Sequence, residues 1–160
     1  MLALVRALTY ATVFIGLLLV FVPGQILEAR GIARPPRIGA VELIGLAVLA
    51  LGAVLVVSCI LTFALIGKGT PAPFDPPRQL VVRGPYKWVR NPMYLGAGLV
   101  LLGAAVYYRS LALALYDAVF LLLTHLFVTF YEEPHLRRVF GQRYEDYRQT
   151  VHRWIPTWRS

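Results

Sequence analysis

Two short polar stretches between long apolar runs hold the residue types that could do chemistry in this 160-residue chain. The first, RGPYKWVRNPMY at residues 83–94, combines three cations, three aromatic residues and two prolines. The second is the acidic pair Glu132–Glu133, which Pro134 follows directly. Asn91–Pro92 favours the start of a helix, with asparagine as the N-cap and proline as the first helical residue. The free N–H groups of such a helix start favour an anion, for example a carboxylate or a phosphate.

Each stretch also has a purely structural interpretation. Arg83, Lys87 and Arg90 suit a positively charged anchor at a membrane surface, where tyrosine and tryptophan commonly form a belt at headgroup depth. The acidic pair could be two solvated charges at a helix end, matched to Arg137 and Arg138. This second interpretation is weakened because acidic side chains at the C-terminus of a helix oppose its dipole.

The composition indicates an integral membrane protein with a single domain. Hydrophobic residues make up 58% of the chain, more than is usual for a soluble globular protein. The net charge is +8, but the basic residues flank apolar segments, which indicates membrane topology and anionic headgroups rather than nucleic acid. The single cysteine, Cys59, excludes an intramolecular disulfide.

Four apolar segments predict an all-α, polytopic membrane helical bundle that occupies residues 1–160. Membrane-spanning helices need about 20 residues, and we expect them at residues 7–22, 38–66, 93–108 and 110–131. The first segment could instead be a signal peptide, but no clear cleavage site follows, and Pro23–Gly24 is better explained as a helix stop. The last two segments are separated only by Arg109 and its neighbours, so they should form a tight helical hairpin.

The distribution of lysine and arginine predicts the orientation of the bundle. With four crossings, residue 6, the connection from 67 to 92 and the tail after residue 131 lie on one side and carry twelve basic residues. The other side carries four: Arg30, Arg34, Arg37 and Arg109. The positive-inside rule therefore places both termini and the 67–92 connection in the cytoplasm. We expect a multi-pass protein of a bacterial or archaeal inner membrane.

The region after the hairpin should form an amphipathic helix on the cytoplasmic face. Proline disfavours helical geometry in the residue before it, so the chain should break at Glu133 and restart at Pro134. Aromatic and apolar residues then recur at helical spacing until Pro156 ends the helix.

Three ionisable residues of the fourth segment lie on one helical face: Asp117, His125 and Glu132. Because an ionisable group is costly in lipid, this face should point into the bundle, where Asp117 and His125 could form a buried hydrogen-bonded pair. The hairpin returns Glu132 to the side on which Asn91 lies. We therefore expect one compact site, with a cationic and aromatic wall and a carboxylate wall.

Small residues recur one heptad apart in two of the apolar segments. Gly45 and Gly52 form one pair, and Gly96 and Gly103 form the other. This spacing lets helices approach closely, and we interpret it as packing.

In their order and spacing, several of these motifs resemble the superfamily of isoprenylcysteine carboxyl methyltransferases and phospholipid methyltransferases, which are integral membrane enzymes. The resemblance covers residues 78–156. Its motifs are Gly-Pro-Tyr86, Arg90-Asn-Pro-Met-Tyr94, the hairpin, Glu132-Glu133, Phe140-Gly141, Tyr144, Tyr147 and the stretch from Val151 to Ile155-Pro156.

The resemblance implies a methyltransferase that uses S-adenosylmethionine, bound at the cytoplasmic ends of the last helices beneath the connecting loop and the tail. The catalytic candidates that it implies are Glu132, Asn91 and Arg90. The implied cofactor contacts are Arg78, Gln79, Leu80, Val81, Tyr86, Asn91, Pro92, Met93, Tyr94 and Glu132. No metal site is expected.

The resemblance also implies a lipophilic acceptor that enters from the bilayer, either a lipid amine or an isoprenylcysteine-like carboxylate. The isoprenylcysteine branch has an arginine where this chain has Val128, which argues against a carboxylate acceptor. His125 is a candidate base if the acceptor must lose a proton. The expected partners are this substrate and membrane lipids, with no nucleic acid, and the oligomeric state is open.

Two alternatives to a methyltransferase are a sterol-reductase-like enzyme and a protein without enzymatic activity. Sterol reductases have a similar tail and use NADPH, but their chains are much longer. A non-enzymatic membrane protein would use its basic loop only to bind anionic lipid. It should tolerate replacement of Glu132, whereas the methyltransferase should lose cofactor binding.

Overall fold

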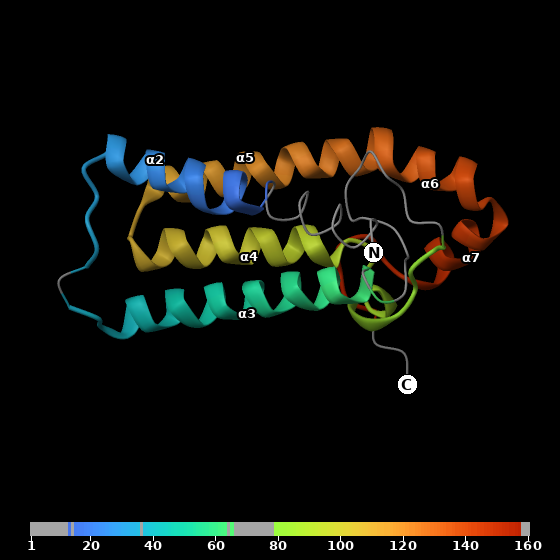
Figure 1. The fold of residues 1–160 in the computed structure, drawn as a ribbon, viewed down its shortest axis with the longest axis horizontal. Helices are drawn as coiled ribbons and strands as arrows, with labels where there is room; N and C mark the ends of the chain where they lie inside the picture. Colours follow the sequence, from blue (N-terminus) through green and yellow to red (C-terminus); the bar gives the residue numbers. More distant parts are fainter. Residues whose placement is uncertain (1–12, 14, 36, 64, 66–78, 158–160) are drawn as a thin grey trace.

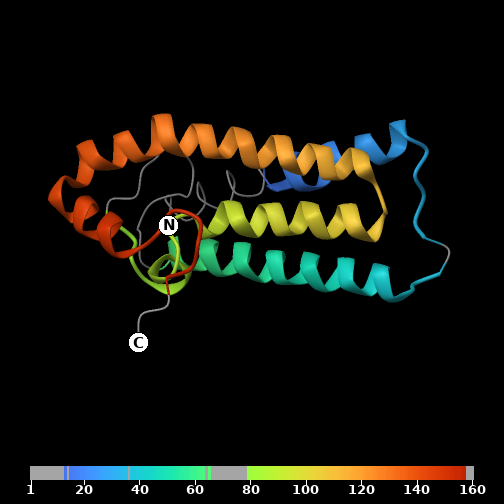
Figure 2. The same cartoon turned by 180° about the vertical axis from the view of Figure 1, so that it is seen from behind.

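The computed structural model describes residues 13, 15–35, 37–63, 65 and 79–157, and every regular element in these ranges is helical. The helices form an elongated bundle, with α2 to α5 side by side and α6 and α7 at one end (Figure 1). Figure 2 shows the same arrangement from behind. The elements are η1 (Gly16–Phe21), α2 (Val22–Ala29), α3 (Ala40–Thr62), η3 (Gly84–Lys87), α4 (Pro92–Tyr107), α5 (Leu111–Phe127), η4 (Val128–Glu132), α6 (Glu133–Phe140) and α7 (Gln142–Thr150).

Among the residues that the structure describes, two apolar helices are long enough to cross a membrane. Helix α3 has 23 residues, and α5, η4 and α6 join into one helix of 30 residues, Leu111–Phe140. At 1.5 Å per residue these helices are about 35 and 45 Å long, against a hydrocarbon core of about 30 Å. The apolar helices Gly16–Ala29 and Pro92–Tyr107 are shorter. The structure thus agrees with the all-α class and with membrane helices, while four crossings remain a prediction.

Glycines allow α3 and α4 to pack backbone against backbone. A Cβ atom added to Gly52 would lie 2.6 Å from the carbonyl oxygen of Gly96, and one added to Gly45 would lie 2.6 Å from the amide nitrogen of Tyr107. These separations are shorter than real Cβ contacts, so neither glycine can carry a side chain unless the helices move apart. The predicted packing role of the heptad glycines is confirmed.

The hairpin between α4 and α5 is as tight as the sequence predicts. Only residues 108–110 connect the two helices. Ser110 is the N-cap of α5 and accepts a hydrogen bond from the amide of Leu113 at 3.3 Å. Arg109 completes the reversal with a positive φ of 48°, which is uncommon for a residue other than glycine. The start of α4 therefore lies at the same end of the bundle as η4 and α6 (Figure 1).

Two predicted helix boundaries at prolines are wrong. Pro23 does not stop the first helix, because it lies in the first turn of α2, where a missing N–H is tolerated. The helix continues to Ala29, while residues 7–12 and 14 of the predicted segment 7–22 lie outside the described residues. Pro134 does not break the chain either. A π-turn precedes it, in which the amide of Glu133 donates to the carbonyl of Val128, and this wider turn accommodates the proline.

The predicted amphipathic tail helix is also wrong as a single element. It divides at Gly141, whose φ of +54° suits glycine and redirects the chain between α6 and α7. Helix α7 ends at Thr150 rather than at Pro156, and the tail after it is not helical. As a result, the tail returns across the start of α4.

Candidate functional site

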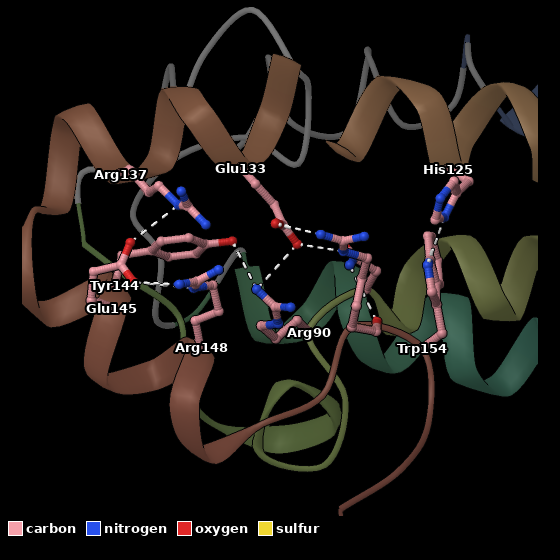
Figure 3. Close-up of polar contacts among 10 residues, drawn as sticks. Arg90, His125, Glu133, Arg137, Tyr144, Glu145, Arg148 and Trp154 are labelled. Carbon is pink, nitrogen blue, oxygen red and sulfur yellow. Dashed lines mark hydrogen bonds and ion pairs between the residues drawn. The ribbon is translucent and has the colours of Figure 1, made fainter. Parts of the chain in front are cut away.

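Asn91, Tyr94 and Glu132 lie where the start of α4, the η4–α6 junction and the C-terminal tail come together. Figure 3 shows Arg90 and Glu133 in the same region. Helix α4 begins at Pro92 with Asn91 as its N-cap, as the sequence predicts. The hydroxyl of Tyr94, in the first turn of α4, donates to Oε2 of Glu132 at 3.0 Å. The structure therefore brings the Asn91 and Glu132 walls together, and Tyr94 is the direct link between the helices.

Asn91 uses its side chain for the tail rather than for its own helix. The side chain makes no capping hydrogen bond, and Nδ2 donates to the carbonyl of Arg153 at 3.2 Å. Asn91 is buried, with 7% of its surface exposed. Because no side chain caps α4, the first N–H groups of this helix lack the partner that an N-cap usually provides.

Glu133 is the centre of a buried charge network. Its Oε1 lies 3.1 Å from a terminal nitrogen of Arg90, and Arg153 donates to both of its oxygens at 2.7 and 2.9 Å. Arg90 also donates to the hydroxyl of Tyr144 at 3.4 Å. Such bidentate, charge-assisted contacts are strong and geometrically specific. They connect the segment just before α4 with α6, α7 and the tail around one carboxylate (Figure 3).

This network corrects the structural interpretations of Glu133 and Arg90. Glu133 is not a solvated helix-end charge matched to Arg137, since Arg137 instead pairs with Glu145 at 3.1 Å. Arg90 is not a free surface anchor, because its side chain is only 9% exposed. Arg153 was missed by sequence reasoning. The only sequence signal for Arg153 was the second acidic residue of the pair, Glu133, because a buried carboxylate needs a cation as its partner.

Besides the pairing of Arg153 with Glu133, four contacts fix the tail across the site. The amide of Arg90 donates to the carbonyl of His152 at 2.9 Å, and the amide of Thr157 donates to the carbonyl of Trp88 at 2.7 Å. The indole nitrogen of Trp154 donates to Nδ1 of His125 at 3.0 Å. The fourth is the contact of Asn91 with the tail described above. The tail therefore forms a cover over the start of α4.

His125 and Asp117 do not form the expected pair. His125 is exposed and contacts the tail through Trp154, as Figure 3 shows. Asp117 is buried, and its Oδ1 has no hydrogen-bond partner. The two side chains are therefore not hydrogen-bonded to each other, although they share a helical face.

The other predicted cofactor contacts lie mostly in two small apolar clusters beside the site. Val81 and Tyr86 pack with Cys59, and Met93 lies against them. Leu80 contacts a second cluster, formed by Tyr144, Tyr147 and Val151. Pro92 is buried, Gln79 is exposed, and Arg78 lies outside the described residues.

Tyr86 joins these clusters to the site. The hydroxyl of Tyr147 donates to the backbone carbonyl of Tyr86 at 2.6 Å. The ring of Phe63 packs edge-on against the ring of Tyr86, with the ring centroids 5.1 Å apart. Burial raises the pKa of Tyr86 well above the usual tyrosine value, and the nearby Cys59 and Glu132 raise it further. Tyr86 is therefore a neutral, packed wall beside Glu132.

Several polar atoms at this end are buried without a hydrogen-bond partner. Among the described residues these include Nε of Arg90, Oγ1 of Thr129 and Nε2 of His135. Thr129 and His135 lie three residues before and after Glu132 in the same continuous helix. Buried polar groups are normally hydrogen-bonded, so this arrangement fits a polar ligand.

Comparison with known proteins gives one clear result. The family model described as phospholipid methyltransferase matches residues 41–143. No curated protein and no solved structure matches the chain.

Proposed function

The chain belongs to the phospholipid methyltransferase family, and on that premise we propose that it transfers the methyl group of S-adenosylmethionine to a lipophilic acceptor in the membrane. The observation that carries this proposal is the family match over residues 41–143, which includes both walls of the site. The family is one of membrane methyltransferases, and its members generally use S-adenosylmethionine. The walls contributed by Asn91–Tyr94 and by Glu132 support a polar ligand here, since they converge through the 3.0 Å contact of Tyr94 with Glu132.

The residues present fit the polar end of this cofactor. S-adenosylmethionine has a carboxylate, an ammonium group and two ribose hydroxyls. The uncapped N-terminus of α4 would hold the carboxylate. Glu132 would accept from the ammonium or from the ribose hydroxyls, and the unpartnered Thr129 and His135 offer further polar contacts. The cofactor supplies an electrophilic sulfonium methyl group.

The chain's own residues would contribute mainly position. Methyl transfer is an in-line displacement, and correct placement of the two reactants supplies a large part of such acceleration. Tyr94 orients the Glu132 carboxylate through its hydroxyl. Glu133 holds the tail in place through Arg153 and so limits the access of water to the site. Arg90 pairs with Glu133 in the same network, so we describe it as a positioning residue rather than as a group that reacts.

The environment of Val128 supports an amine rather than a carboxylate as the acceptor. Val128 is an uncharged residue with 0% of its surface exposed, so this position offers no cation to an acidic substrate. A lipid amine needs no such cation. It would approach from the bilayer, and we further propose that this end of the bundle and both termini face the cytoplasm.

Calorimetry of the purified protein in detergent tests the cofactor. S-adenosylmethionine and S-adenosylhomocysteine should both bind, and NADPH should not. Glu132→Ala should weaken the binding of both by about tenfold or more, since it removes a charge-assisted contact. Glu28→Ala is the matched control, because it removes an exposed carboxylate from α2. No heat from either sulfur compound would refute the proposal, and heat from NADPH would favour a reductase.

Mass spectrometry tests the acceptor. Membranes that contain the wild-type protein should accumulate N-methylated lipids, and membranes that contain Glu132→Ala should not. Methyl esters in place of methylated amines would contradict the amine acceptor.

A further inference from the structure

The bundle has a second polar region at the end away from the candidate functional site. An open hollow of about 630 Å³ lies between the α2–α3 connection and the α4–α5 turn. Its lining includes three arginines, Arg34, Arg37 and Arg109, together with Tyr108 and Glu42. These elements lie at the end of the bundle opposite α6 and α7 (Figure 1). Helix α3, about 35 Å long, separates the hollow from the candidate functional site.

The one carboxylate among these residues is already satisfied. Oε1 of Glu42 accepts from Nε of Arg109 at 2.8 Å, and Oε2 accepts from the backbone amide of Gly39 at 2.8 Å. The side chain of Glu42 is only 5% exposed. Glu42 therefore balances one of the three arginines and leaves an excess of two positive charges around the hollow.

The arginines remain accessible to a ligand. Arg109 is held through Nε, yet its side chain is 64% exposed, so its terminal nitrogens are free of Glu42. Arg34 and Arg37 are exposed, and neither forms an ion pair with a residue that the structure describes. Guanidinium groups that are exposed and positioned in this way suit a phosphate, which accepts bidentate hydrogen bonds.

Large exposed apolar side chains lie within two residues, in sequence, of residues that line the hollow. Ile38, Val41 and Ile44 are 58%, 41% and 59% exposed, and Leu111 is 73% exposed. They adjoin the arginines in sequence, at the starts of α3 and α5. A free phosphate would leave this apolar surface uncovered, whereas acyl chains would cover it. We propose that the hollow binds an anionic phospholipid, with its phosphate at the arginines and its chains along α3 and α5.

Native mass spectrometry of the protein in detergent can test this site. The probes are phosphatidylglycerol and phosphatidylcholine with identical acyl chains. The wild-type protein should retain phosphatidylglycerol in preference. The double variant Arg34→Ala/Arg37→Ala should bind it more weakly by roughly fivefold for each arginine removed. The control Arg30→Ala/Arg143→Ala removes the same charge from exposed positions outside the hollow and should leave binding unchanged.

Three outcomes would overturn the proposal. If Arg30→Ala/Arg143→Ala weakens the binding of phosphatidylglycerol as much as Arg34→Ala/Arg37→Ala does, the effect comes from the overall charge of the protein and not from the hollow. Equal retention of phosphatidylcholine would show that the arginines do not select the lipid. Displacement of phosphatidylglycerol by excess inorganic phosphate would identify the hollow as a site for a free anion.

Two further measurements separate this site from folding and from the candidate functional site. Arg34→Lys/Arg37→Lys keeps both charges but loses the bidentate contacts, so it should bind phosphatidylglycerol more weakly than the wild type and more tightly than the alanine variant. If the lysine variant binds phosphatidylglycerol as weakly as an alanine variant that is shown to be folded, the positive charges do not contribute to lipid binding as proposed. The binding of S-adenosylmethionine should be unchanged in the alanine variant, so failure at one site is distinguishable from failure at the other.

Discussion

The two ends of the bundle each contain a buried glutamate that contacts arginine, but they use it differently. The side chains of Glu133 and Glu42 are both 5% exposed. Glu133 pairs with two arginines whose side chains are 9% and 28% exposed, so the cations are withdrawn from solvent together with it. Glu42 pairs with Arg109, which remains 64% exposed. One end uses its arginines to hold the chain together, and the other presents them outward.

The difference has an energetic basis. When two charges are buried together, removal of one leaves the other unpaired in a medium that solvates it poorly, which costs about 3–5 kcal/mol. An ion pair with an exposed partner contributes only about 0–1 kcal/mol, since water replaces the lost contact. The same substitution at the two glutamates should therefore have unequal effects.

Glu133→Gln should have the largest effect. It leaves Arg90 and Arg153 without their carboxylate and should lower the free energy of unfolding by about 3–5 kcal/mol. Thermal unfolding in detergent should show the loss, and limited proteolysis should cut the tail faster than in the wild type. An unchanged melting temperature would contradict the interpretation of Glu133 as the centre of the network.

Gly52→Ala should have an intermediate effect and should spare both ends. Its new Cβ would meet the carbonyl oxygen of Gly96 at 2.6 Å, so α3 and α4 must separate, at a cost of about 1–3 kcal/mol. Gly24→Ala is a suitable control, because a Cβ there meets nothing within 4 Å. If both variants unfold at the same temperature, the close approach of α3 and α4 is not required.

Glu42→Gln should have a small effect, of about 1 kcal/mol or less on unfolding. Arg109 is exposed enough to be solvated, and glutamine can still accept from the amide of Gly39. The measurement is the same thermal unfolding as for Glu133→Gln. A loss as large as that at Glu133 would remove the distinction between the two ends.

Tyr144→Phe should act mainly at alkaline pH. Burial, with a further contribution from Glu133, raises the pKa of Tyr144 to about 12, above the usual value of about 10. The stability linked to this shift is present below pH 10 and is lost as pH rises through about 12, because the unfolded chain ionises first. The Tyr144→Phe variant should therefore lose less stability than the wild type between about pH 10 and about pH 12.

The parts of the fold that local signals control were predicted correctly. The apolar run of α3, the Asn91–Pro92 start of α4 and the heptad glycines each depend on residues within one or two turns. The hairpin required only that two apolar runs be separated by a short polar turn. From these signals alone, the meeting of Asn91 and Glu132 could be inferred.

The parts that depend on long-range contacts were not predicted. The sequence predicts a helix break at Pro134, but the π-turn before it keeps the helix intact. Arg153 reaches Glu133 only because Gly141 redirects the chain, and no spacing in the sequence encodes that pairing. The tail that covers the candidate site therefore had to come from the structure.

The π-turn at Val128–Glu132 also has a consequence for the two neighbouring glutamates. Such a turn holds one residue more than an α-helical turn, and each helical residue rotates the direction of its side chain by about 100°. The extra residue therefore shifts the register of everything that follows it. Glu132 contacts α4 through Tyr94, while Glu133 contacts the arginines that hold the tail. Loss of one residue from this turn would rotate α6 away from both partners, so the length of the turn matters as much as the identity of the two acids.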